Sequence, residues 1–440
     1  MNIYQQYAAV NGRLAQGKRV FFHEIGGNGS LPRSQAAGHR QLCYPQIGIY
    51  TGAGTSHSWL WFVEIFERLG FHDLCFLDEK HIREGRMGGV DVLAVSGGDT
   101  FAMAEGLGLD GAQALEMFIV NGGLYLGSCA GAYLPLKSSK AHLNLFNFVE
   151  AKVANLTRIL PEAKTVSKNF CTPYGCSYIF HPVREALSLA STGVMPFDRV
   201  DNFVAPLYGG PAMIASDKMD VMAYYSGFTQ KTTFLVDEWL AGETLLGKAA
   251  VVRKRMGKGN LYLFGPHFEH PFYPIANALI ADTIYWDAGQ KASNGNNKGH
   301  HLGMLHGDTC KSFIRNVKRE LSNARIVAFA MEGQSMSWLI GKKEYEPEKI
   351  RVFLEALWKR LKPLEKRDTL RMEDEEKDNI FTYASQTTSL LREMKKESDK
   401  GHDTNHLARA MFENLKMLSA LFLGIYFKTI HLESGVSHAL

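Results

Sequence analysis

The chain has 440 residues, of which 45% are hydrophobic and 21% are charged. This composition is that of globular proteins and excludes a wholly disordered chain, and the length suits two or three domains. The formal net charge of +4 at pH 7 gives no reason to expect nucleic acid or a membrane surface as a partner.

The cysteines and the apolar runs indicate where the protein resides. The 6 cysteines lie far apart and form neither a metal-type CxxC pair nor a dense disulfide framework, so we expect reduced thiols in a cytoplasmic protein. The first residues contain no apolar stretch typical of a signal peptide. The apolar run at 417–427 predicts a buried helix, because a membrane-spanning helix needs roughly 20 residues.

Composition changes along the chain and predicts two domains. Residues 289–301, GQKASNGNNKGHH, are rich in Gly, Asn and Lys and are expected to form a linker. Only 7 of the 42 glycines follow residue 302, where charged residues become denser. We therefore expect an α/β domain over residues 1–288 and a helical bundle over residues 302–440.

Strand-like and helix-like segments alternate in the first domain. Buried strands are predicted at 47–50, 90–95 and 124–127, and helices at 56–70 and 111–123. Such alternation predicts a parallel sheet with helices on both faces.

The later part of the first domain has a different pattern. The segment HPVREAL, 181–187, is expected to begin a helix. Residues 218–265 predict three strands, with a tight turn at 257–259 between the last two. The segment 274–289 is predicted to be helical.

Four segments of the second domain have apolar residues at helical spacing. They are 311–332, 347–362, 377–397 and 406–427. An antiparallel bundle is the natural packing for such helices. No motif in this domain indicates chemistry, so a role in homo-oligomer formation or in binding a protein partner is the expectation for it.

The segment GGLYLGSCAGAYLPL, 122–136, carries the most informative motif. A predicted strand leads into Gly127-Ser128-Cys129-Ala130-Gly131, the Gly-x-nucleophile-x-Gly pattern of a nucleophile elbow with Cys in place of Ser. The flanking glycines allow a turn in which larger side chains would collide. The helix N-terminus that follows favours a thiolate at Cys129. The alternative is a small buried cysteine in a glycine-rich turn.

Two glycines precede a second predicted helix. In VSGGDTF, 95–101, Gly97 and Gly98 follow a strand and can bring a backbone amide close to a substrate carbonyl, with the amide of Ala130 as the other donor. The alternative is a plain strand-to-helix turn in which Asp99 caps the helix.

A histidine and a glutamate follow the last predicted strand. In LYLFGPHFEHP, 261–271, His267 and Glu269 are two residues apart, so extended backbone would point both toward one site. The carboxylate can then orient an imidazole that takes the thiol proton. His270 is expected to point away. Because no third ligand stands at a recognisable spacing, we expect no metal and no cofactor.

Together these motifs resemble the class I glutamine amidotransferase-like superfamily. Within it, the chain is most similar to the N-terminal-like domain family of biotin-protein ligases. The similarity covers roughly residues 45–288 and is carried by TGAGTS (51–56), VSGGDTF (95–101), GGLYLGSCAGAYL (122–134), LYGGPAM (207–213) and GKAAVVRKRMGKGNLYLFGPHFEHP (247–271).

The resemblance implies a fold and a set of residue roles. The fold is a flavodoxin-like, doubly wound, mostly parallel sheet, here followed by an all-α domain. Cys129 is implied as nucleophile, His267 as base and Glu269 as its orienting group, with Gly98 and Ala130 as oxyanion donors.

The chain also departs from the pattern. Tyr133 stands where many amidotransferases have Gln or His, and Phe268 stands where Pro is usual. No biotin ligase catalytic motif follows in 302–440, so ligase activity is not implied.

Three functions fit these observations. The first is a Cys-dependent amidase or amidotransferase-like hydrolase that acts on a small amide through a Cys-His-Glu triad. The second is a dipeptidase or cyanophycinase-like peptidase, because GGDTF and GSCAGA also resemble segments of that group with Cys for Ser. The third is a non-catalytic protein that binds a ligand or partner. An activated thiol at Cys129 distinguishes the first two from the third.

Overall fold

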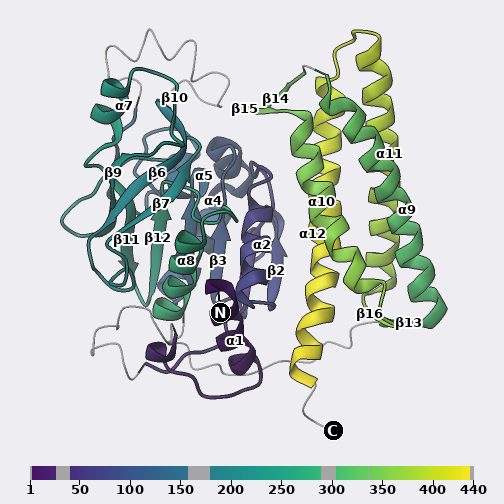
Figure 1. Cartoon of the computed structure of the whole chain (residues 1–440), viewed down its shortest axis with the longest axis horizontal. Coiled ribbons are helices and arrows are strands. Elements are labelled where there is room, and N and C mark those ends of the chain that lie inside the picture. Colours follow the sequence, from purple (N-terminus) through teal and green to yellow (C-terminus); the bar gives the residue numbers. More distant parts are fainter. Residues whose placement is uncertain (1, 26–39, 157–178, 289–303, 335, 437–440) are drawn as a thin grey trace. The chain divides into compact units, whose positions relative to one another are not determined.

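The computed structural model describes residues 2–25, 40–156, 179–288, 304–334 and 336–436. The chain divides into two compact units, Met1–Ala292 and Ser293–Leu440 (Figure 1). The expected linker, residues 289–301, lies outside the described residues.

The first unit is built on one large sheet. Its helices are α1 (Ile3–Ala15), α2 (Trp59–Leu69), α3 (Glu79–Arg83), α4 (Thr100–Val120), α5 (Ala130–Tyr133), α7 (Glu238–Leu245) and α8 (Pro274–Asp287). Its strands are β1 (Ile47–Tyr50), β2 (Leu74–Leu77), β3 (Val92–Val95), β4 (Leu124–Ser128), β5 (Lys152–Val153), β6 (Val183–Ser191), β7 (Asn202–Leu207), β8 (Met213–Ile214), β9 (Asp220–Phe228), β10 (Thr233–Phe234), β11 (Ala249–Met256) and β12 (Gly259–Phe264).

Five neighbouring strands of this sheet are parallel. They lie in the order β2-β1-β3-β4-β12, and β11 then continues the sheet antiparallel to β12 and to β9. With β12 as the fifth parallel strand, the order is the flavodoxin-like 2-1-3-4-5. The first unit is therefore an α/β domain with the flavodoxin-like set of parallel strands that the sequence predicts, continued on one side by antiparallel strands. The carboxyl ends of β1, β3, β4 and β12 share one edge, where ligands bind in such sheets.

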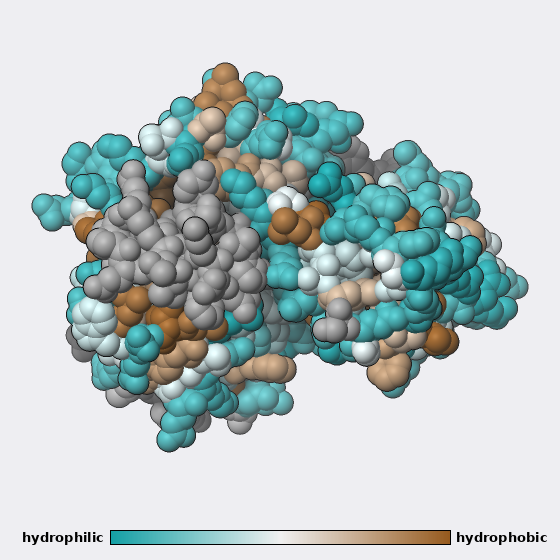
Figure 2. All heavy atoms as spheres, turned by 90° about the horizontal axis from the view of Figure 1, so that it is seen from above, coloured by the Kyte–Doolittle hydropathy of each residue, from teal (hydrophilic) through white to brown (hydrophobic). Residues whose placement is uncertain are grey.

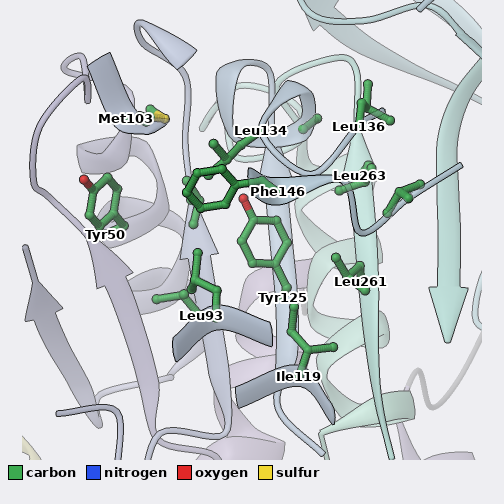
Figure 3. Close-up of a cluster of buried hydrophobic side chains, with 14 of the residues drawn as sticks. Tyr50, Leu93, Met103, Ile119, Tyr125, Leu134, Leu136, Phe146, Leu261 and Leu263 are labelled. Atoms are coloured by element: carbon green, nitrogen blue, oxygen red, sulfur yellow. The ribbon is translucent and has the colours of Figure 1, made fainter. Parts of the chain in front are cut away.

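Side chains of the parallel strands alternate between two faces, as extended backbone requires. Leu93, Tyr125 and Leu261 belong to a buried cluster with Met103 and Ile119 of α4 (Figure 3). The opposite face is covered by other helices, which contact one another as the pairs α1–α2 and α1–α8. On that face, Phe76 of β2 packs against Trp59 of α2 with ring centroids 5.8 Å apart. Both faces of the parallel sheet are thus buried, as the continuous apolar runs predict.

The prediction of a helix start at 181–187 is wrong. After His181 and Pro182, the chain enters β6, which pairs antiparallel with β7 and β9. Pairing with strands that lie later in the sequence overrides the local helical preference of Arg-Glu-Ala-Leu.

The second unit consists mainly of four helices. They are α9 (Gly307–Glu332), α10 (Pro347–Leu364), α11 (Asp374–Asp399) and α12 (Asn405–Val436), and α9 and α12 each contact both α10 and α11. The four predicted segments are confirmed as helices. Two short antiparallel ribbons add to them, β13 (Met304–His306) with β16 (Thr369–Arg371) and β14 (Trp338–Ile340) with β15 (Lys343–Tyr345).

The last helix, α12, contains the apolar run that the sequence predicts to be buried. By length and composition, Asn405–His431 could cross a membrane, yet 61% of its most apolar window is buried inside the protein. Leu415, Leu418 and Leu423 have no exposed surface.

Hydrophilic residues cover much of the surface visible in Figure 2. Among the described residues, large apolar side chains that are mostly exposed include Phe272 and Phe329.

Candidate active site

The turn between β4 and α5 places Cys129 at the carboxyl edge of the sheet. Cys129 has φ 52° and ψ −108°, a strained conformation for a residue with a side chain. A Cβ at Gly127 would lie 2.4 Å from Gly131 O, and a Cβ at Gly131 would lie 2.1 Å from Val95 O. The motif therefore forms the elbow that the sequence predicts, and its glycines are required by close backbone contacts.

The loop after β12 brings His267 and Glu269 to this elbow. The Cys129 amide donates to Phe264 O at 3.0 Å, which fixes the elbow against the end of β12. The Nδ1 atom of His267 lies 2.6 Å from Glu269 Oε1, and His267 also hydrogen bonds to the Cys129 side chain. Since Nδ1 faces the carboxylate, Nε2 is the nitrogen available to the thiol. The three side chains that the sequence singles out are thus in one hydrogen-bonded chain.

The side chains of Cys129, His267 and Glu269 are buried away from water. Cys129 is 5% exposed, His267 4% and Glu269 0%. Burial by itself lowers the pKa of His267, but the charges of Glu269 and Cys129 outweigh it and raise this pKa from 6.5 to about 10. The imidazole therefore favours its protonated form beside the sulfur.

Ser128 is a member of the site that the sequence did not reveal. Its hydroxyl donates to Glu269 Oε2 at 2.7 Å, so both oxygens of the buried carboxylate have a partner. Ser128 precedes the nucleophile, and its side chain points toward the loop after β12. The only signal in the sequence is a hydroxyl residue beside the cysteine, and a contact across 141 residues is not readable from spacing.

Two partly buried aromatic rings pack around His267. The ring centroids of Trp61 and Tyr208 lie 5.3 Å and 5.7 Å from that of His267. The expectation that His270 points away is wrong, because its ring packs on Trp61 at 4.5 Å and on Tyr208 at 6.2 Å. Burial, and then the nearby charge of His267, lower the pKa of His270 to about 4. His270 is therefore a neutral ring in this aromatic surround.

The segment LYGGPAM, residues 207–213, lies next to the elbow. Tyr208 O lies 3.9 Å from the Cys129 Sγ, and the Tyr133 hydroxyl donates to Gly209 O at 3.2 Å. A Cβ at Gly210 would lie 1.7 Å from Gly265 O, so only glycine fits there. Tyr133, which departs from the amidotransferase pattern, thus holds a loop of the site.

The three residues expected to form the oxyanion site lie beside Cys129. The next amide along the chain from each of Gly98 and Ala130 already has an acceptor. Asp99 N donates to Gly54 O at 2.7 Å, and Gly131 N donates to Ser96 O at 3.1 Å. Ala130 is the first residue of α5, where an amide has no acceptor within the helix. Across the described part of the chain, the Gly98 amide has no hydrogen-bond acceptor either.

Gly97 lies directly against His267, the candidate general base. A Cβ at this position would lie 2.8 Å from His267 Cε1, so a side chain larger than hydrogen would displace the imidazole. The adjacent Asp99 caps α4 by accepting from Phe101 N at 3.0 Å and from Ala102 N at 3.2 Å. The same turn therefore caps α4 through Asp99 and carries Gly97 and Gly98 of the candidate site.

Over the described ranges, no group of three or more His, Cys, Asp or Glu residues is arranged to hold a metal ion.

Comparison with known proteins gives distant similarities of fold. The sequence matches no protein-family model and no curated protein. A ThuA-like protein from Bacteroides uniformis is 13% identical with a TM-score of 0.33, over 61% of this chain and 98% of that chain. A glutamine amidotransferase from Thermotoga maritima is 10% identical with a TM-score of 0.31, over 54% of this chain and 84% of that chain.

A β-galactosidase from Bacillus circulans is also similar. It is 11% identical with a TM-score of 0.30, and 56% of this chain is covered. The matched region spans only 31% of that enzyme's length.

Proposed function

We propose that the first unit is a cysteine-dependent amide hydrolase or acyl transferase that works through a thioester on Cys129. One observation carries the proposal. The Cys129 side chain, on a strained elbow, hydrogen bonds to a buried imidazole whose other nitrogen lies 2.6 Å from the Glu269 carboxylate. This is the nucleophile, base and orienting group of covalent acyl transfer.

The first half-reaction would acylate the cysteine. The Cys129 sulfur attacks the carbonyl carbon of the amide, and the carbonyl electron pair moves to oxygen to form a tetrahedral oxyanion. As the oxyanion collapses, the C–N bond breaks and His267 gives its proton to the leaving nitrogen. The products are an amine and a thioester on Cys129. The raised pKa of His267 suits this order, because the imidazole starts protonated beside the sulfur.

The second half-reaction would release the acyl group. His267, now neutral, takes a proton from water as the water oxygen attacks the thioester carbonyl. The C–S bond then breaks, which yields a carboxylic acid and restores Cys129 and protonated His267. An amine in place of water would give transfer instead of hydrolysis. Glu269 keeps the imidazole oriented in both steps.

A peptidase with Cys in place of Ser would use the same groups, so the two catalytic alternatives differ in substrate and not in chemistry. A protein that only binds a ligand has no use for a protonated imidazole held between a carboxylate and a thiol. The geometry therefore favours catalysis over the non-catalytic alternative.

We also propose a relationship of the first unit to the N-terminal-like domains of biotin-protein ligases. The segments TGAGTS and LYGGPAM, two of the five that carry that resemblance, contact the residues of the candidate site. Thr55 forms a β-bridge with Gly98, and Tyr208 O lies 3.9 Å from the Cys129 Sγ.

The test is to trap the acyl enzyme. The full-length protein is incubated with primary amides and dipeptides, and covalent adducts are sought by intact mass spectrometry. We expect an adduct on Cys129 that hydroxylamine removes, with amine release that is lost in Cys129→Ala. Cys75 is an internal control, because burial raises the pKa of its thiol to about 12 and should leave it unlabelled. Amine release that persists in Cys129→Ala would refute the proposal.

A further inference from the structure

The carbonyl oxygen of Gly97 accepts three hydrogen bonds from the segment that follows β1. The donors are Ser56 N at 3.1 Å, Ser56 Oγ at 3.0 Å and Ser58 Oγ at 3.3 Å. Both serines are buried, with 6% and 1% of their surface exposed. The Ser96 hydroxyl is a fourth and longer donor at 3.5 Å, and the Ser56 and Ser58 hydroxyls also lie 3.1 Å from each other. A carbonyl within such a network is held firmly in direction, since rotating it would leave buried polar groups without partners.

Fixing this carbonyl also fixes the amide of Gly98. The Gly97 C=O and the Gly98 N–H belong to the same planar trans peptide unit, so they point in opposite directions. The bridge between Thr55 and Gly98 agrees, because its hydrogen bonds run from Ser56 N to Gly97 O and from Asp99 N to Gly54 O. In that pattern the Gly98 N–H points away from the serine segment.

The turn that contains Gly98 runs along the elbow. The Ser96 carbonyl, one residue before Gly97, accepts from Gly131 N at 3.1 Å, and the Thr100 hydroxyl, two residues after Gly98, donates to Ala130 O at 3.2 Å. The chain bends at Gly97, whose carbonyl faces the serines. The Gly98 N–H therefore points away from the serines in a turn that contacts the elbow on both sides of the Gly97–Gly98 peptide unit.

The serine segment is itself anchored. Glu79, in α3, accepts from Ala53 N at 2.8 Å, and the Tyr50 hydroxyl donates to Ala53 O at 3.1 Å. The hydroxyl of Thr55 donates within the segment to Gly52 O at 2.7 Å. The two serines thus project from a fixed frame.

We propose that Ser56 and Ser58 are positioning residues that aim the Gly98 amide at the oxyanion formed during acyl transfer to Cys129. This inference rests on the proposed function. Neither hydroxyl is required to touch the substrate. Each acts through the Gly97–Gly98 peptide unit, and a hydrogen-bond donor aimed before the reaction stabilises the developing negative charge without reorganisation.

Two reagents separate this role from an effect on the thiol. Iodoacetamide alkylates a thiolate by direct displacement and forms no oxyanion, whereas p-nitrophenyl acetate acylates it through a tetrahedral oxyanion. Both modifications of Cys129 are followed by peptide mass spectrometry in the full-length wild type, Ser56→Ala, Ser58→Ala and the double variant. Thr244→Val is the matched control, since it removes a buried hydroxyl of the first unit that donates to Leu240 O in α7 and lies outside the site.

We expect the double variant to keep its alkylation rate within about twofold of wild type and to lose at least about tenfold in acylation. Loss of a complete oxyanion donor costs about 10²–10³ in rate, and misdirecting one should cost part of that. The single variants should show smaller losses in acylation, and Thr244→Val none. The single variants carry the test if the double variant does not fold.

Two results would overturn the inference while leaving the proposed function intact. Acylation and alkylation that fall together would mean that the serines act on the thiol–imidazole pair, and an unchanged acylation rate would mean that they do not position the donor. If wild-type Cys129 reacts with neither reagent, the proposed function fails and the inference fails with it.

Discussion

Ser128 and Glu269 show how one hydroxyl supports a buried charge. Glu269 has no exposed surface, and the Ser128 hydroxyl is the partner of the carboxylate oxygen that His267 does not use. A buried carboxylate oxygen without a donor is unfavourable by about 1–3 kcal/mol. The Ser128 hydroxyl therefore gives this oxygen a donor and holds the carboxylate where the imidazole needs it.

We expect Ser128→Ala to lower the free energy of unfolding by about 1–3 kcal/mol, measured by urea denaturation. Ser419→Ala is the matched control, because this buried hydroxyl of α12 has no hydrogen-bond partner among the described residues. That variant should be neutral or slightly more stable. Equal losses in the two variants would show that Ser128 matters only for packing.

The protonated state of His267 predicts how stability depends on pH. Its pKa is about 10 in the folded protein, against 6.5 for an ordinary histidine. The folded state thus binds this proton more tightly, and its contribution to stability is complete below pH about 6.5 and is lost as pH rises to about 10. The stability difference between wild type and His267→Gln should shrink over that range in urea titrations. A difference that stays constant or grows with pH would contradict the assignment.

The elbow is the element on which the site depends. Its geometry combines a positive φ at Cys129 with backbone contacts at Gly127 and Gly131 that leave no space for a Cβ. Spacing of glycines around a cysteine was enough to predict this turn, because the constraint is local. The flanking strands were equally predictable, since continuous apolar runs are typical of strands buried on both faces.

Gly131→Ala should destabilise the first unit by about 3 kcal/mol, because the new methyl group would lie 2.1 Å from Val95 O. Gly12→Ala, in α1, has nothing within 4 Å of the added Cβ and should instead stabilise the protein by about 0.5–1 kcal/mol. Thermal and urea unfolding of the two variants would compare them. A Gly131→Ala protein as stable as wild type would contradict the described turn.

Elements and contacts that depend on distant parts of the chain were not predictable. The hydrogen bond from Ser56 to Gly97 spans 41 residues, and no local pattern marks it. The strand β6 was expected to be a helix because its preference is decided by pairing with β7 and β9. The ribbons of the second unit were missed since their strands have only 3 residues each.

Taken as a whole, the chain contains two cores of different kinds. The first unit buries the two faces of a sheet, and the second buries the inner faces of four helices. In the second unit the buried Trp338 indole donates to Thr404 Oγ1 at 2.8 Å, and Asn414 Nδ2 donates to Thr387 Oγ1 at 2.6 Å. These bonds give the helical core a defined register.

Because each unit has its own core, we expect Leu418→Ala to lower the stability of the second unit by about 2–5 kcal/mol. Leu418 has no exposed surface. Thermal unfolding should show a transition that moves to lower temperature while the reactivity of Cys129 below that temperature stays at the wild-type value. A loss of Cys129 reactivity in the folded variant would show that the second unit supports the site.

The most direct measurement is the alkylation rate of Cys129 by iodoacetamide as a function of pH, in wild type and His267→Ala. The hydrogen bond between His267 and Cys129, with the imidazole pKa at about 10, predicts a wild-type rate that is already at its plateau below pH about 7.5 and a variant that loses this plateau. A wild-type rate that rises like that of an ordinary thiol with pKa about 8.5, and does so equally in His267→Ala, would contradict an activated cysteine.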